Sequence, residues 1–166
     1  NFHTDKKYNI LFKELDKHIE AFITALGYDL TKFNINIVKA RSTYTAKDQH
    51  IALHCHTASH FSTVYYVRAD EMGDLTIEEE QGAKLGLYIP PTDQYFKEWN
   101  QLNFASYKLK AETGNFVIFP STLMHKTENN TTNIPRISIS SDILLTMREG
   151  VSAEHCIPHP SGWRTL

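Results

Sequence analysis

The sequence predicts an all-β core behind one N-terminal helix, with the strands arranged as a double-stranded β-helix, or jelly roll. Three observations lead to this fold class. Apolar residues follow a helical period over residues 10–26 and then form short runs over residues 35–143. Polar or glycine- and proline-containing turns separate these runs, as in all-β domains. The length suits one domain, expected over residues 1–166 with a barrel at about 35–143 and a tail at 150–166.

The segment 10–26 carries apolar residues every three or four positions, which is typical of an amphipathic helix. Gly27 follows the last of them and is a suitable stop. The apolar positions are Leu11, Leu15, Ile19, Phe22, Ile23 and Leu26. We therefore expect one helix that ends near Gly27.

Eight short apolar runs after the helix are candidate strands. Residues 90–104 interrupt them with two prolines and several aromatic side chains, and we expect this insert to cover one end of the barrel. The candidate strands are 35–40, 51–56, 64–69, 75–79, 85–89, 107–111, 116–119 and 136–143.

The composition is that of an ordinary globular domain, with 41% hydrophobic and 22% charged residues. A net charge of −2 argues against nucleic-acid binding, which needs a concentrated positive field. No run approaches the ~18 apolar residues of a membrane span, and no signal-peptide pattern occurs. These observations predict no nucleic-acid and no membrane partner. Cys55 and Cys156 are expected to be reduced thiols, which predicts a cytoplasmic protein.

Four of the nine histidines, His50, His54, His56 and His60, fall within eleven residues. Residues two apart in a strand point to the same face, so a strand over 51–56 would project His54 and His56 together. Two imidazoles on one face form half of a typical metal site. Taken alone, the pair could equally be two exposed or hydrogen-bonded histidines.

His125 offers the other half of such a site. Gly114 begins a turn into the apolar strand 116–119, Pro120 ends that strand, and His125 follows on the next short segment. A barrel brings such distant segments together, so His125 can complete a three-imidazole site, although alone it could be an exposed loop residue. Three protein ligands leave open positions, as a catalytic metal requires, and imidazole suits Fe, Zn, Cu or Ni.

Two nearby histidines, His50 and His60, are not expected to bind the metal. His60 shares the parity of His54 and His56. We expect the strand to end near residues 57–59, so that this parity is lost before His60.

Arg136, Ser138 and Ser140 alternate along a predicted strand and share one face, with isoleucines on the other. A guanidinium that points into a barrel is costly unless it meets an anion. An acidic co-substrate would be that anion, because arginine offers a bidentate fork to a carboxylate. The alternative places Arg136 in solvent and turns the isoleucines inward.

Together these motifs resemble the iron(II)- and 2-oxoglutarate-dependent oxygenases, in particular a bacterial and phage group related to the prolyl-hydroxylase type. The likeness runs over about residues 35–143. The motifs that carry it are His54-Cys55-His56, Ser62-Thr63-Val64-Tyr65-Tyr66, Phe119-Pro120-Ser121 with His125, and Arg136-Ile137-Ser138-Ile139-Ser140.

The resemblance implies an oxidoreductase that uses Fe(II) and 2-oxoglutarate and hydroxylates a substrate with release of succinate and CO2. Arg136 and Ser138 would hold the distal carboxylate of 2-oxoglutarate, and Tyr66 would donate to it. Tyr66 could instead be a core aromatic residue.

The same resemblance implies metal binding by His54, His56 and His125. His56 stands where this superfamily usually has an aspartate or glutamate. A neutral ligand there leaves the metal site one charge unit more positive, which should alter the oxidant and the metal preference.

Two other functions fit parts of the sequence. A cupin-type dioxygenase or isomerase would not need 2-oxoglutarate, and Gly114, Pro120, His125 and Asn129 fit most of its second motif. A carbohydrate-binding jelly roll would explain exposed aromatic residues but not three histidines placed to converge. For the oxygenase we expect a small-molecule or peptide substrate, and a homodimer is compatible with the sequence.

Overall fold

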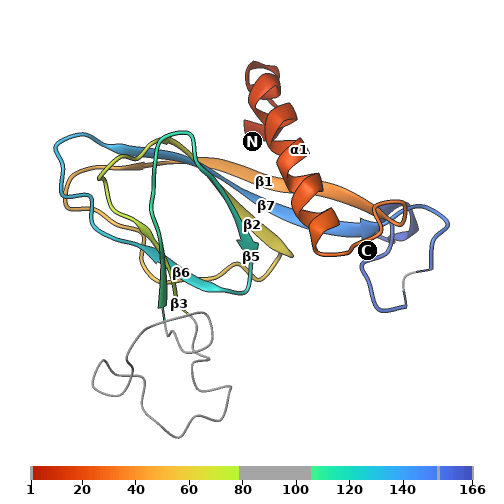
Figure 1. Ribbon diagram of the computed structural model, residues 1–166. Helices are drawn as coiled ribbons and strands as arrows, with labels where there is room; N and C mark the ends of the chain where they lie inside the picture. Colours follow the sequence, from red (N-terminus) through yellow and green to blue (C-terminus); the bar gives the residue numbers. More distant parts are fainter. Residues whose placement is uncertain (1, 79–105, 153, 166) are drawn as a thin grey trace, which may run out of the picture.

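The computed structural model describes residues 2–78, 106–152 and 154–165. One long helix precedes a set of β-strands, and three short 3-10 helices lie near the chain ends (Figure 1). The helices are η1 (Phe2–Thr4), η2 (Lys6–Tyr8), α1 (Asn9–Ala25) and η3 (Pro160–Gly162). The strands are β1 (Phe33–Thr45), β2 (Phe61–Arg68), β3 (Leu75–Glu78), β4 (Ser106–Leu109), β5 (Phe116–Pro120), β6 (Met124–Thr127) and β7 (Arg136–Met147).

The described strands form two antiparallel sheets. The larger sheet has the order β1-β7-β2-β5, and the smaller has the order β4-β3-β6. Figure 1 shows α1 across the outer face of the larger sheet, with β3 and β6 on its other side. This is the layered arrangement that the alternation of turns and short strands predicted.

The helix covers its face of the larger sheet with the apolar stripe that the sequence predicted. Ile19 and Ile23 pack in one cluster with Phe61, Ile143 and Leu145. Phe12, outside the predicted stripe, is buried as well, whereas Leu26 is 51% exposed because the helix ends one residue before it. No helix in the described ranges combines the length and apolar character needed to cross a membrane.

Most predicted strands coincide with observed ones, but residues 51–56 do not form a strand. Backbone hydrogen bonds join His54 to His125 in both directions, and Thr127 N donates to the carbonyl of Ile51. The first segment advances three residues between these contacts, from 51 to 54, whereas the second advances only two, from 125 to 127. This mismatch interrupts the β-ladder and leaves His54–His125 as an isolated bridge. The segment beside it is β6, which the sequence did not predict as a strand. The predicted strand 85–89 and the aromatic insert 90–104 lie outside the described residues.

Candidate metal and co-substrate site

A cavity of about 210 Å³ lies between the two sheets. Its lining comes from β1, β2, β5 and β7 of the larger sheet and from β3 and β6 of the smaller one. The described lining residues include two arginines and three histidines but no aspartate or glutamate. These side chains are Arg41, Arg136, His54, His56 and His125.

The three histidines converge at one place in this cavity. One ring nitrogen of each lies within 4.8 Å of those of the other two. The ring centroids of His54 and His125 are 4.2 Å apart, and that of His56 lies 5.1 Å and 5.2 Å from these two. The geometry is that of a group able to hold one metal ion.

Hydrogen bonds fix which nitrogen each ring presents to a metal. His54 Nδ1 donates to the carbonyl of Ala52 at 2.8 Å, and His125 Nδ1 donates to that of Leu123 at 2.9 Å. Because Nδ1 is occupied in this way, Nε2 carries the free lone pair. His56 Nε2 is buried and has no hydrogen-bond partner among the described residues. Such an orphaned acceptor fits a metal ligand.

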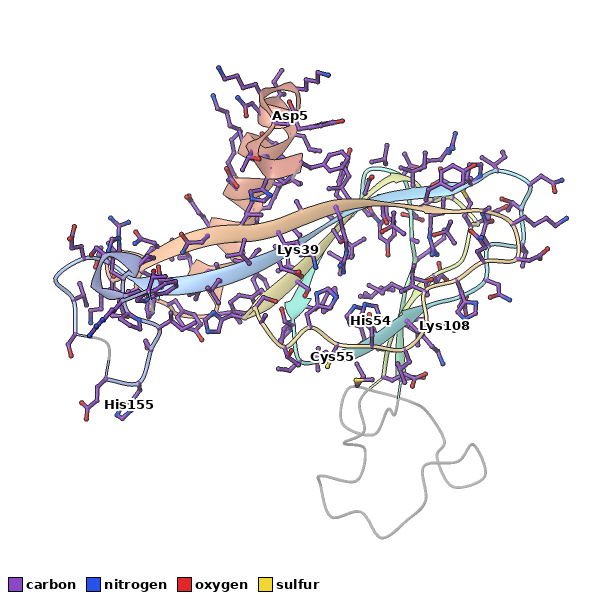
Figure 2. All side chains as sticks on the ribbon, turned by 180° about the vertical axis from the view of Figure 1, so that it is seen from behind. Asp5, Lys39, His54, Cys55, Lys108 and His155 are labelled. Carbon is purple, nitrogen blue, oxygen red and sulfur yellow. The ribbon has the colours of Figure 1, made fainter. Side chains whose placement is uncertain are left out.

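Backbone hydrogen bonds hold the segment that carries His54 and His56. The bridge between His54 and His125 sets these two residues opposite each other, and His56 N donates to the carbonyl of Ser121 at 2.8 Å. Figure 2 shows His54 and its neighbour Cys55 on this segment, beside the smaller sheet. Cys55 and Cys156 are both free thiols.

His125 is suited to binding a metal as a neutral ligand. Burial lowers the pKa of His125 to about 4, although the hydrogen bond to the Leu123 carbonyl acts in the opposite direction. The positive charges of His54, His56 and Arg41 contribute in the same direction as burial. At neutral pH the ring is therefore unprotonated, as metal coordination requires.

His60 lies outside this group, as expected. Its Nδ1 accepts a hydrogen bond of 3.0 Å from the backbone of Leu145, and residues 57–58 form a bend, so the strand parity is lost. His50 is exposed and also lies outside the group.

Arg136 points into the molecule rather than into solvent and is only 2% exposed. Its Nη1 donates to the carbonyls of Gly73 and Met72 at 2.7 Å and 3.3 Å. Its Nη2 donates to the hydroxyl of Thr127 at 2.7 Å and lies 3.5 Å from that of Thr45. These neutral acceptors fix the orientation of the guanidinium without neutralising its charge.

Gly73 is required for that arrangement. Its φ of +94° is in the left-handed region, and a Cβ built there would lie 2.5 Å from the carbonyl oxygen of Glu128. No other residue type fits, because every side chain begins with a Cβ. No sequence pattern singled out this glycine.

Tyr66 lines the cavity close to Arg136. Its hydroxyl is buried without a hydrogen-bond partner among the described residues, and burial raises the pKa of Tyr66 to about 12. The phenol is therefore protonated and free to donate. Its ring also packs with Ala69 and Ala111, so Tyr66 is a core aromatic residue with an unsatisfied donor.

Ser138 and Ser140 line the same cavity, on the face of β7 that carries Arg136. Ile139 packs on the opposite side, in the cluster that contains Phe12 and Leu15 of α1. The predicted alternation along this strand is therefore confirmed. Two more residues, Asp142 and Ser62, contact His56 and were not predicted. Extending the alternation by one step, from Ser140 to Asp142, would have found the first of them.

Residues 42–142 match the model of a protein family described as "Putative 2OG-Fe(II) oxygenase". The chain belongs to this family. The family match selects the oxygenase over the cupin and the carbohydrate-binding module, and iron(II) and 2-oxoglutarate are the cofactor and co-substrate of such oxidoreductases. A comparison with curated proteins gave no match.

Solved structures of oxygenases share the fold. An oxidoreductase of the 2OG-Fe(II) oxygenase family from Burkholderia pseudomallei has 15% identity and a TM-score of 0.50, over 67% of this chain and 45% of that one. A prolyl-4-hydroxylase from Pseudomonas putida has 11% identity and a TM-score of 0.54, over 85% of this chain and 69% of that one. The predicted double-stranded β-helix is therefore confirmed. This chain spans less than half the length of the Burkholderia protein.

Proposed function

We propose that this chain is an iron(II)- and 2-oxoglutarate-dependent oxygenase that hydroxylates a small-molecule or peptide substrate and releases succinate and CO2. The observation that carries the proposal is the joint presence, in one cavity, of three imidazoles able to hold a metal and a buried guanidinium.

The metal position fits iron(II) by the chemistry of its donors. His54, His56 and His125 would each bind through Nε2, and the orphaned Nε2 of His56 gains a partner in this way. Dioxygen would be the oxidant, and bound iron and 2-oxoglutarate would supply the chemistry that activates it, with one oxygen atom going to the substrate and the other to succinate. The chain itself binds and orients the reactants and limits their contact with water.

The co-substrate position fits a dicarboxylate. Arg136 would bind the distal carboxylate of 2-oxoglutarate, because its charge has no carboxylate partner among the described residues. Tyr66 would donate a hydrogen bond from its free hydroxyl to the same carboxylate. Ser138 would assist from the inward position of β7 next to Arg136. A dianion suits this cavity, because the charged side chains among its described lining residues are all cationic.

The primary substrate would meet the cavity on the side of β1, where Arg41 and Thr43 belong to the lining. The Pseudomonas putida structure is that of a prolyl-4-hydroxylase. A peptide is therefore one reasonable class of substrate for this chain, and a small molecule is the other.

The test is a calorimetric titration of 2-oxoglutarate into anaerobic, iron-loaded protein, followed by an assay of succinate release in air. We expect saturable binding that requires the metal. If the protein binds iron but not 2-oxoglutarate, the proposed oxygenase activity is wrong.

A further inference from the structure

We propose that Asp142 takes over, through His56, the charge role of the carboxylate ligand that this site lacks. Asp142 is then a positioning residue, which orients His56 and strengthens its bond to the metal. The inference rests on the proposed metal site and adds a component to it.

The contact between the two side chains is direct. His56 Nδ1 lies 2.5 Å from Asp142 Oδ1, and the two side chains are only 12% and 16% exposed. Nδ1–H donates to the carboxylate, which leaves the lone pair of His56 on the buried Nε2. Ser62 Oγ lies 3.0 Å from the same Nδ1 and limits rotation of the ring.

His56 differs in this respect from the other two candidate ligands. His54 and His125 donate through Nδ1 to neutral backbone carbonyls, those of Ala52 and Leu123. Among the three rings, the charged partner belongs to the one that occupies the usual position of a carboxylate ligand. The site therefore keeps a negative charge next to the position of the usual carboxylate ligand, but the charge lies on Asp142, behind His56, rather than on a ligand itself.

The strand register explains why Asp142 is there. Arg136, Ser138, Ser140 and Asp142 occupy alternate positions of β7 and so share its inner face. Asp142 lies opposite Ser62 in the β2–β7 pair, so both reach His56 from neighbouring strands. On its other side it lies opposite Lys39 of β1, labelled in Figure 2, but no ion pair joins Lys39 to Asp142 in the structure. Of these neighbours, it is His56 that forms the ion pair with the Asp142 carboxylate.

A carboxylate on the outer nitrogen of a ligating histidine has three physical effects. It fixes the tautomer and the ring orientation, and it raises the electron density on the nitrogen that binds the metal. A nearby negative charge also offsets part of the positive charge that a dication and three neutral ligands leave in the cavity. Loss of such a partner commonly weakens metal binding about 10–100-fold.

The experiment measures the dissociation constants of Fe(II) and Zn(II) by competition with a chelator, without 2-oxoglutarate. Asp142→Asn keeps the shape and an acceptor oxygen but removes the charge, and we expect about 10–100-fold weaker binding. Glu20→Gln makes the same charge change on the exposed face of α1 and should leave the metal affinity unchanged. In a His56→Ala background, Asp142→Asn should have a much smaller effect, because only its through-space charge then acts on the metal.

Unchanged affinity in Asp142→Asn, or an equal effect with and without His56, would overturn the inference while leaving the metal site intact. Absence of metal binding in the wild type would instead defeat the proposed function. Nitrogen-15 histidine NMR of the zinc-loaded wild type is a second test that needs no variant to fold. The Nδ1 proton of His56 should be shifted farther downfield than those of His54 and His125, and three equal shifts would contradict the proposal.

Discussion

Tyr66 and Arg136 lie close enough in the cavity to interact electrostatically, and the Tyr66 hydroxyl is left without a hydrogen-bond partner among the described residues. Tyr66 lies opposite Ser138 in the β2–β7 register, one inward position from Arg136. Burial raises the pKa of Tyr66 to about 12, although the positive charge of Arg136 acts in the opposite direction. The guanidinium has several acceptors, whereas the Tyr66 hydroxyl has none among the described residues.

Tyr66→Phe should therefore leave the ligand-free protein at least as stable as the wild type. An unsatisfied buried hydroxyl is unfavourable, and its removal leaves no partner orphaned. The same change should weaken 2-oxoglutarate binding about tenfold, the effect of one hydrogen bond to a charged group. Urea denaturation and calorimetry give the two quantities. A variant that loses stability but binds 2-oxoglutarate normally would show that the hydroxyl has a structural role only.

Arg136→Leu should weaken 2-oxoglutarate binding by roughly two to three orders of magnitude while the metal stays bound. Arg136→Lys keeps the charge but loses the planar fork, so its affinity for 2-oxoglutarate should fall between those of the wild type and Arg136→Leu. The Leu variant should also lose stability, because the carbonyl of Gly73 and the hydroxyl of Thr127 each lose a donor.

Arg68→Leu is the matched control for Arg136. Arg68 lies on β2, donates to the carbonyl of Pro135 and is outside the cavity lining, so its loss should not affect 2-oxoglutarate. Equal binding by wild type and Arg136→Leu would show that a different group anchors the co-substrate.

Substitution of His54, His56 or His125 by Ala should sharply lower the metal bound to purified protein. Each ring would contribute one of three protein ligands, so any single loss would leave only two. His60→Ala is the control, and it should retain full metal content because His60 faces the backbone of Leu145. Metal analysis by plasma mass spectrometry gives the stoichiometry, and full occupancy in all three alanine variants would exclude this site.

Gly73→Ala should destabilise the protein by on the order of 2 kcal/mol or more, because it combines a positive φ with a collision against the Glu128 carbonyl. It should also weaken 2-oxoglutarate binding, since the Gly73 carbonyl helps to hold Arg136. Gly114→Ala is a suitable control. Gly114 also has a positive φ but has open space around its Cβ position, so the strain occurs without the collision.

Acidification should destabilise the metal-free protein over the range from about pH 6.5 to pH 4. His125 has a pKa of about 4 when folded, against an ordinary value of 6.5, so the unfolded chain takes up a proton that the folded protein refuses. Stability should be unaffected by this group above pH 7 and should fall as the pH is lowered. In His125→Gln the fall measured by urea denaturation should be shallower, and an equal slope would contradict the assignment.

Much of the fold could be predicted because the signals are local. The apolar period of α1 and the alternation along β7 are properties of the backbone, so they appear directly in the order of the residues. The alternation also put Arg136, Ser138 and Ser140 on one face of the strand, but the packing of the chain decided that this face points inward. The segment 51–56 was predicted wrongly as a strand, since its mismatch with β6 depends on a partner far away in the sequence.

The sequence by itself determined the kind of donors at this site: three histidines, an arginine on an alternating strand, and no carboxylate in the expected ligand position. Only the tertiary structure decided which nitrogen of each ring is free and which partner each side chain meets. The pairing of His56 with Asp142 joins residues 86 positions apart, and that of Arg136 with the Gly73 carbonyl joins residues 63 apart. Such contacts depend on strand register and on the exact path of loops, which the packing of the whole chain sets and no local pattern encodes.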